Sequence, residues 1–232
     1  MADGDGSELA RGLEIAWARR VHGGSWLVIG WFATSVLALV YAYLRDDVGV
    51  FGKRVDGTRK LVSTVLLLPY LWVTAAVWHA ARLLVREPAV SPVPGARLWL
   101  ARRLLAHELP AEVRVVIDLT CEFIEPASIR GETYVCMPIL DARAPKLVDL
   151  QAAIEKVADA DAVLIHCAQG HGRTGLFAAA LLLRRGLAHT PAQALAKVMA
   201  ARPNVRLSSA QARALHEYAL AHKSAQQRKP VE

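Results

Sequence analysis

Cysteine is scarce in this chain of 232 residues, which contains only Cys121, Cys136 and Cys167. Three cysteines are too few for a disulfide framework, so we expect Cys121 and Cys136 to be buried and reduced. The alternative is that one of them approaches Cys167 and forms a disulfide with it under oxidation. No internal repeat, low-complexity tract or basic run interleaved with aromatic residues is present. A nucleic-acid partner is therefore not expected, although the formal net charge is +7.

Charged residues are missing from two long stretches. Ser25 to Leu44 has none across 20 residues, and Leu61 to Trp78 has none across 18 before the apolar character continues to Val85. A helix that crosses the core of a bilayer needs about 20 such residues. The sequence therefore predicts a transmembrane helical hairpin with spans at 25–44 and 61–85. A buried hairpin in a soluble protein is the alternative, but the remaining chain cannot cover so much apolar surface.

The polar parts of the chain complete the predicted organisation. Residues 1–24 begin with an acidic, glycine-rich tail and form either a short helix at the membrane surface or a solvated segment. Residues 86–96 contain three prolines, which is typical of a stiff linker. A globular domain is expected at 97–222, and 223–232 is a polar tail.

The most informative stretch runs from His166 to Gly175, between a predicted buried strand at Ala162–Ile165 and a predicted helix. Gly170 and Gly172 allow the loop to turn successive backbone N–H groups inward, where they line an anion site. The N-terminus of the following helix adds partial positive charge at the same place. The stretch therefore predicts an anion-binding loop at the end of a central strand.

Cys167 at the strand end and Arg173 at the helix start face the same predicted cavity. Their chemistry fits phosphate, with a cysteine nucleophile beneath it and a guanidinium fork holding two of its oxygens. Backbone N–H groups, the helix N-terminus and Arg173 all favour the thiolate form of the cysteine. A structural glycine turn with a buried cysteine is the alternative interpretation.

The pattern His-Cys-x-x-Gly-x-x-Arg-Thr over residues 166–174 resembles the signature loop of the cysteine-dependent protein tyrosine phosphatase superfamily, in particular its dual-specificity branch. The resemblance extends from about Arg97 to Tyr218. It implies an α/β fold, with a dual-specificity-phosphatase-like mixed sheet flanked by helices. It also implies an enzyme that hydrolyses phosphomonoesters through a phosphocysteine intermediate, with neither metal nor cofactor.

The resemblance assigns a role to each residue of the motif. Cys167 is the nucleophile, Arg173 binds the phosphate, and Thr174 helps the thiolate leave in the second step. His171 occupies a variable position, where it either adds positive charge near the substrate or is solvated. The predicted phosphate-binding loop consists of His166, which orders it, and of Ala168, Gln169, Gly170, His171 and Gly172.

The reaction also needs a general acid for the leaving oxygen. Tyr134–Leu140 is predicted to be a strand broken by a proline, and Asp141 follows it on a loop. Members of the dual-specificity branch carry their acid on such a loop, so Asp141 is the candidate. It could instead cap the helix expected near Pro145. Asp118 and Glu122 are weaker candidates for the acid.

The periodicity of the globular domain predicts four strands and four helices. The strands are expected near 98–100, 113–118, 134–137 and 162–166. The helices are expected near 146–158, 174–185, 191–201 and 208–221. The phosphate-binding loop would then lie at the carboxyl end of a central strand, where ligands usually bind in such sheets.

A membrane-anchored phosphatase is the resulting expectation. Basic residues outside the two spans outnumber those between them, which favours a multi-pass protein with its catalytic domain in the cytoplasm. The expected partners are the lipid bilayer and a phosphorylated protein, carrying phosphotyrosine, phosphoserine or phosphothreonine. A lipid phosphate, such as phosphatidylglycerophosphate or a phosphoinositide, is the alternative substrate. Ala168 and Gln169 provide no lysine for a highly phosphorylated lipid. An inactive phospho-binding module is a second alternative.

Overall fold

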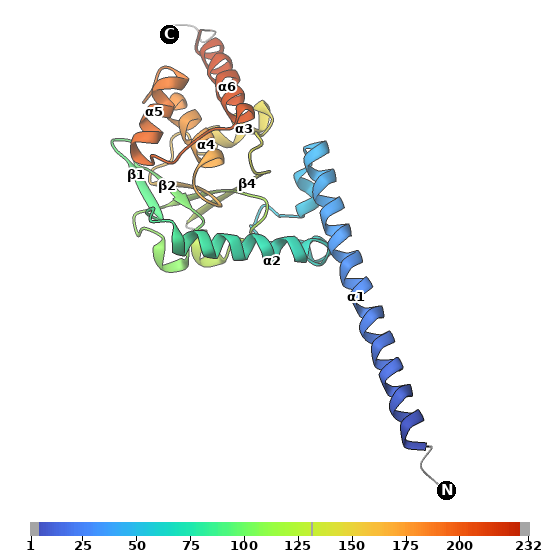
Figure 1. Ribbon diagram of the computed structural model, residues 1–232. Coiled ribbons are helices and arrows are strands. Elements are labelled where there is room, and N and C mark those ends of the chain that lie inside the picture. The colour runs from blue at the N-terminus through green and yellow to red at the C-terminus, as the bar shows by residue number, and fades with distance from the viewer. Residues whose placement is uncertain (1–4, 131, 228–232) are drawn as a thin grey trace.

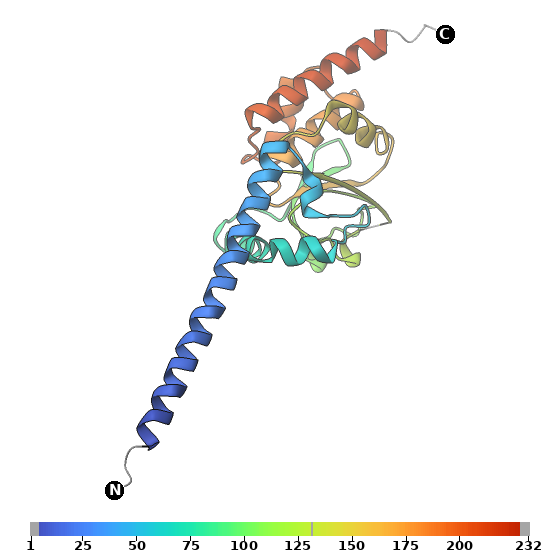
Figure 2. The same cartoon turned by 90° about the vertical axis from the view of Figure 1, so that its right-hand side faces the viewer.

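Two long helices precede a compact α/β unit (Figure 1). The computed structural model describes residues 5–130 and 132–227, and side chains from residue 25 onward. Helix α1 (Asp5–Arg45) is followed by a short 3-10 helix, η1 (Val48–Phe51), and by α2 (Leu61–Leu84). Figures 1 and 2 agree that α2 lies along one side of the α/β unit, whereas α1 extends far beyond it.

A five-stranded mixed sheet forms the centre of the α/β unit. Its strands lie in the spatial order β1 (Val90–Val93), β2 (Leu98–Arg102), β5 (Val163–Cys167), β3 (Val115–Thr120) and β4 (Thr133–Ile139). Only β1 is antiparallel to its neighbour; the other pairs are parallel. Strands β3 and β5 are buried along their whole length, which explains their continuous apolar sequences. The predicted α/β fold with a mixed sheet is confirmed.

Four helices complete the α/β unit on the side of the sheet away from α2 (Figures 1 and 2). They are α3 (Leu147–Glu155), α4 (Gly172–Arg184), α5 (Pro191–Ala201) and α6 (Ser209–Gln227). Helix α4 is almost entirely buried and packs against both α5 and α6. Helix α5 begins as its sequence predicts, because Thr190 caps it by accepting a hydrogen bond from the Gln193 N–H and Pro191 follows.

The segment expected to be a stiff linker at 86–96 is instead part of the fold. Its residues Val90–Val93 form edge strand β1, paired in register with β2. Pro92 is exposed on this edge strand, a position where a missing N–H is tolerated. The proline content of this segment therefore gives the wrong prediction. Its burial alternates as in a strand, with Ser91 and Val93 buried and Pro92 exposed. The predicted polar tail also starts later, because α6 continues to Gln227.

Both apolar helices expected from the sequence are present. Ser25–Arg45 within α1 and Leu61–Leu84 are long and apolar enough to cross a membrane by length and composition. Within the N-terminal segment expected at 1–24, residues 5–24 form the first part of helix α1. Residues 1–4 lie outside the described part of the chain.

The loop between these helices docks onto the five-stranded sheet, and this differs from the expected two-span hairpin. The Lys53 ammonium donates to the Asp118 carboxylate on β3 and, at 2.7 Å and 2.8 Å, to the backbone and side-chain oxygens of Thr120. Phe51 is fully buried in the same region. A loop on the far side of a bilayer could not make these contacts. The loop and the sheet therefore pack directly against each other.

Asp118 is held ionised at this junction. Burial alone would raise its pKa, but His166, Lys53 and a hydrogen bond from Tyr134 bring it down to about 2. A fully buried carboxylate and a buried ammonium are stable here only as a pair. Asp118 is therefore a structural residue, and its candidacy as the general acid is not supported.

Replacing Lys53 should therefore destabilise the whole molecule. We expect Lys53→Met to lower the free energy of unfolding by about 3–5 kcal/mol, because it leaves Asp118 charged and unpaired in the interior. Lys60→Met, at an exposed position in the same loop, is the matched control. Unfolding of the detergent-solubilised protein in urea measures both. Equal stability of the two variants would contradict the role given to the Lys53–Asp118 pair.

Candidate active site

The loop between β5 and α4 brings Cys167 to the base of a pocket. Its sulfur accepts a hydrogen bond from the Gly170 N–H at 3.3 Å, and only 3% of the residue is exposed. Gly170 has φ +75°, and a Cβ there would lie 2.6 Å from the backbone carbonyl of Ala101. A side chain is excluded on both grounds. The close packing of this loop against β2 therefore requires glycine.

Arg173 is fixed at this loop by a second carboxylate. Its guanidinium donates two hydrogen bonds to Glu122, at 2.6 Å and 2.9 Å, and one to the Ile139 carbonyl at 3.0 Å. Burial alone would raise the pKa of Glu122, but Arg173 lowers it. Glu122 is thus an ionised acceptor and not a proton donor. It positions Arg173, a role that sequence reasoning missed because the two residues lie 51 positions apart.

Asp141 lies at the rim of the same pocket. Its carboxylate is 3.2 Å from an Arg173 nitrogen, and its side chain is 73% exposed. The Ser208 hydroxyl holds this loop by donating to the Ala142 carbonyl at 2.7 Å. Helix α3 starts at Leu147 with no side-chain cap, so Asp141 does not cap it. Of the two interpretations of Asp141, the position beside Arg173 favours the catalytic one.

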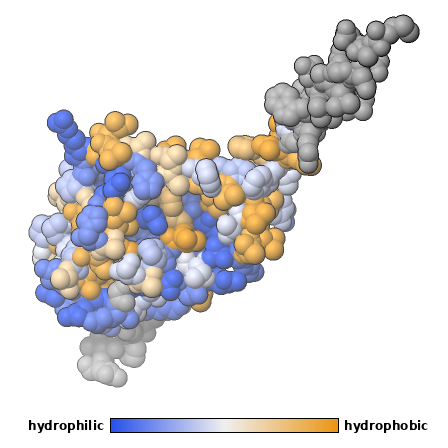
Figure 3. Space-filling model, turned by 90° about the horizontal axis from the view of Figure 1, so that it is seen from below, coloured by the Kyte–Doolittle hydropathy of each residue, from blue (hydrophilic) through white to orange (hydrophobic). Residues whose placement is uncertain are grey.

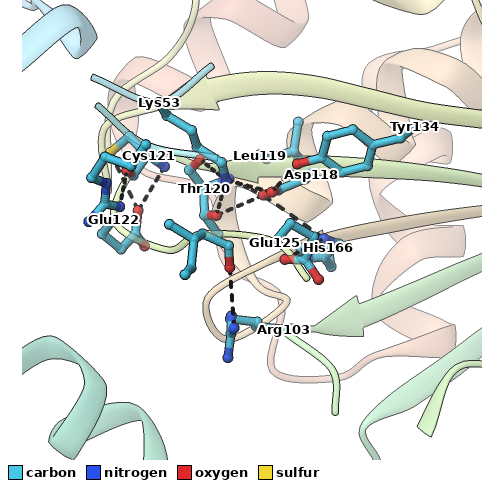
Figure 4. A network of polar contacts seen from close by, with 12 residues as sticks. Lys53, Arg103, Asp118, Leu119, Thr120, Cys121, Glu122, Glu125, Tyr134 and His166 are labelled. Atoms are coloured by element: carbon cyan, nitrogen blue, oxygen red, sulfur yellow. Dashed lines mark hydrogen bonds and ion pairs between the residues drawn. The ribbon is translucent and has the colours of Figure 1, made fainter. Parts of the chain in front are cut away.

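His166, the residue before Cys167 on β5, is completely buried and lies beside Asp118 and Glu125 (Figure 4). Neither ring nitrogen has a hydrogen-bond partner among the described residues, and the ring lies 3.9 Å from Asp118 and 3.8 Å from Glu125. Burial lowers the pKa of His166 to about 4, so the ring is neutral at pH 7. This position is consistent with ordering the loop. The Thr174 hydroxyl is likewise buried and, within the part of the chain that the structure describes, unpartnered.

Asp118, Glu125 and His166 place their ligand atoms within 4.8 Å of one another, close enough to hold a metal ion. The Lys53 ammonium, however, already supplies the cation at Asp118 (Figure 4). Burial and Asp118 raise the pKa of Glu125 to about 8, so this carboxyl is largely protonated at pH 7. The Lys53 ammonium thus compensates the charge of Asp118 within this cluster.

His171 is paired rather than solvated. Its Nε2 lies 2.7 Å from a carboxylate oxygen of Glu87, from the segment between α2 and β1. Arg202 donates to the same oxygen at 2.9 Å and to the Gln169 carbonyl at 3.1 Å. Glu87 and Arg202 therefore hold the phosphate-binding loop from outside. No local sequence signal marks either residue.

Helix α2 forms one wall of the pocket, which has a volume of about 420 Å³. Trp78 is 2% exposed and donates its indole N–H to the Ala168 carbonyl of the phosphate-binding loop at 3.2 Å. Arg103 lies over the Trp78 ring at 5.2 Å and over Phe123 at 5.0 Å. The apolar sequence of α2 predicts a membrane span, and it gives no sign of the part that this helix has in the site.

The other two cysteines are free; Cys121 is buried as expected, whereas Cys136 is only partly buried. Burial and the neighbouring Glu122 raise the pKa of the Cys121 thiol well above its usual range. Burial raises the pKa of Cys136 to about 11. Neither thiol is activated for exchange with Cys167.

Comparison with known families identifies this arrangement. Residues 102–228 match the model of the family described as PTP-SAK, Swiss Army Knife protein, DSP-PTPase phosphatase domain, which is more than half of the chain. The chain belongs to this family. As a DSP-PTPase domain, it is a phosphoric monoester hydrolase of the dual-specificity type. No curated protein sequence matches the chain.

Solved structures agree with the family. Tk-PTP in its active form is 28% identical, covers 57% of this chain and 97% of its own, and has a TM-score of 0.50. The human tyrosine phosphatase-like serine/threonine/tyrosine-interacting protein is 19% identical, covers 59% of this chain and 99% of its own, and has a TM-score of 0.51. The second likeness concerns the fold alone. Each alignment covers less than two thirds of this DSP-PTPase chain.

Loss of the Glu122 charge should weaken phosphate binding. We expect Glu122→Gln to raise the KM for para-nitrophenyl phosphate by roughly tenfold or more, in keeping with about 1.5–3 kcal/mol for a hydrogen bond to a charged group. Arg173 would then be less firmly oriented, while the dependence of the rate on the leaving group should not change. Glu132→Gln removes an exposed carboxylate and is the control. A changed leaving-group dependence would instead assign Glu122 a role in proton transfer.

Proposed function

We propose that this protein hydrolyses phosphomonoesters through a phosphocysteine intermediate on Cys167. The observation that carries the proposal is the convergence of Cys167, Arg173 and Asp141 on one pocket. A sulfur nucleophile lies at its base, a guanidinium beside it and an exposed carboxyl at its rim. These are the three groups that phosphoryl transfer to cysteine requires.

In the proposed first step the Cys167 thiolate attacks phosphorus as the bond to the leaving oxygen breaks. Protonated Asp141 donates its proton to that oxygen, and Arg173 with the N–H groups of residues 168–172 holds the other phosphate oxygens. Water then attacks the phosphocysteine and Asp141 takes a proton from it. The S–P bond breaks, aided by the Thr174 hydroxyl. One water is consumed, and an alcohol and inorganic phosphate are released.

The substrate is proposed to be either a phosphorylated protein or a lipid phosphate. Protein dephosphorylation is the expectation from the family resemblance. A specific observation favours lipid: an apolar helix, α2, forms part of the pocket wall. We also propose that the protein is attached to a membrane through α1 and α2, with its catalytic unit in the cytoplasm. An inactive binding module is disfavoured by the complete set of reacting groups.

Substitution of the nucleophile tests the reaction. Cys167→Ser should abolish hydrolysis of para-nitrophenyl phosphate, because a serine hydroxyl in this loop is not ionised at neutral pH. It should still bind tungstate in a calorimetric titration, whereas Arg173→Ala should lose both turnover and binding. Normal turnover by Cys167→Ser would refute the phosphocysteine intermediate. Tungstate binding with no turnover by the unsubstituted protein would point to the binding module.

Substitution of the acid tests the proton transfer. Asp141→Asn should slow hydrolysis of alkyl phosphates by roughly 10²-fold or more, the usual contribution of a general acid. Aryl phosphates with good leaving groups should lose much less, since their oxygens leave without a proton. Asp149→Asn, on helix α3, is the control. Equal losses for both kinds of substrate would assign Asp141 a structural role.

A further inference from the structure

Helix α2 has two apolar stripes on opposite sides. One stripe lines the catalytic pocket and includes Tyr70, Thr74 and Trp78, at intervals of four residues, beside Val77. The other is exposed and includes Leu61, Val65 and Trp72. Mean hydropathy counts the residues of both stripes together. The helix therefore has the sequence pattern of a membrane span. Only the second stripe is free to contact a partner.

Both ends of α2 are tied to the catalytic unit. Just before the helix, Lys53 binds Asp118 and Arg59 donates to the Cys121 carbonyl at 2.9 Å. Near its end, Trp78 binds the phosphate-binding loop and Glu87 binds His171. A helix of 24 residues is about 36 Å long, so crossing a bilayer would place these ends on opposite sides of a core about 30 Å thick. Helix α2 therefore lies along the catalytic unit and does not cross.

The exposed stripe of α2 is continuous with an apolar surface on α1. The Trp31 indole donates to the Val65 carbonyl at 2.8 Å, which joins the helices and satisfies its polar atom. An apolar cleft lies between them, lined by Phe32, Leu68 and Trp72 among others. Most of the exposed large apolar side chains in the described part of the chain belong to these two helices. Figure 3 shows orange patches on this face. We call these exposed side chains of α1 and α2 the membrane face.

The distribution of charged residues along α1 and α2 indicates which partner covers the membrane face. The helices contain no acidic residue between 25 and 45 or between 61 and 84. Basic residues flank the apolar stretches at Arg45, Lys60 and Arg86, and acidic residues follow Arg45 and Arg86 directly in the sequence. Arg82 instead stacks on the Trp78 ring. An apolar surface without acidic side chains and with basic residues at its ends is complementary to a bilayer that contains anionic lipids. A protein partner with an apolar groove would not require these basic residues.

We propose that α2 lies flat on an anionic bilayer and that the pocket takes the phosphomonoester headgroup of a membrane lipid. The proposal rests on the phosphatase function proposed above and specifies its substrate. Because α2 touches lipid on one side and the pocket on the other, the pocket lies within about one helix diameter, 10–12 Å, of the bilayer. A lipid headgroup can therefore reach Cys167 without its chains leaving the membrane.

The placement of α2 can be tested without measuring activity. Single cysteines would replace Val55, in the loop before α2, and Val148, on the catalytic unit, both of which are exposed. With Cys136→Ala and Cys167→Ser as background, a membrane-impermeant maleimide would be applied to intact expressing cells and to inverted membrane vesicles. We expect both positions to be labelled in the same preparation. Labelling of Val55→Cys only in the opposite preparation, or only after detergent, would overturn the proposal.

The substrate is tested by comparing lipid in vesicles with soluble phosphate. The full chain would be assayed on phosphatidylglycerophosphate in vesicles of phosphatidylcholine and phosphatidylglycerol, on a short-chain soluble analogue, on a phosphotyrosyl peptide and on para-nitrophenyl phosphate. The variant Val65→Glu/Trp72→Glu should lower the ratio of activity on vesicle lipid to activity on para-nitrophenyl phosphate by about tenfold or more. Without its apolar contact, α2 no longer holds the pocket at the bilayer, and the effective concentration of lipid at the pocket falls. Val148→Glu is the matched control and should leave the ratio unchanged.

The outcomes separate this proposal from the phosphatase function itself. Hydrolysis of para-nitrophenyl phosphate without hydrolysis of vesicle lipid would overturn the lipid proposal and keep the phosphatase. Preference for the phosphotyrosyl peptide, or an unchanged ratio in Val65→Glu/Trp72→Glu, would also overturn the lipid proposal. Failure of the full chain on every substrate would overturn the phosphatase function instead.

Discussion

The ion pair between Lys53 and Asp118 joins the N-terminal helices to the catalytic sheet, and the position of the pocket wall formed by α2 depends on it. A buried ammonium has one stable place here, against the Asp118 carboxylate on β3. Once Lys53 is there, Arg59 reaches the Cys121 carbonyl, next to the Glu122 that holds Arg173. Helix α2 then begins beside the pocket and runs along it.

The local parts of the site could be predicted from the sequence. A buried strand, two glycines and a helix start lie within one short stretch around Cys167, so sequence order alone brings the reacting groups together. Asp141 could be proposed because it follows a strand that ends near the same edge of the sheet. Strands β2 to β5 and helices α3 to α6 were predicted with shifts of a few residues at their ends, apart from the longer α6, because their patterns are strongly periodic.

The contacts that hold the site could not be predicted in the same way. Glu122, Glu87 and Arg202 meet the loop only through tertiary folding, and nothing near them in sequence marks the pairing. Strand β1 was obscured by its proline. The disposition of α2 was missed for a different reason. Hydropathy measures how apolar a residue is and carries no information on whether lipid or protein covers it.

The site also shows how one arginine can be both buried and available. Burial alone would lower the pKa of Arg173, but Glu122 raises it well above its usual range, so the guanidinium stays charged. Glu122 holds one edge of the group, and the Asp141 carboxylate contacts it at the pocket rim.

Because Trp78 of helix α2 lines the pocket, the catalytic unit includes residues that precede the family domain. Sequence similarity to the family starts at residue 102, after α2 and after Glu87. The contacts of the structure place the start of the catalytic unit earlier in the sequence. Lys53, Trp78 and Glu87 all contact residues of the catalytic domain. A chain cut at the homologous border would keep every reacting group and lose one side of its pocket. In this protein the smallest complete enzyme is therefore larger than the domain that its relatives define.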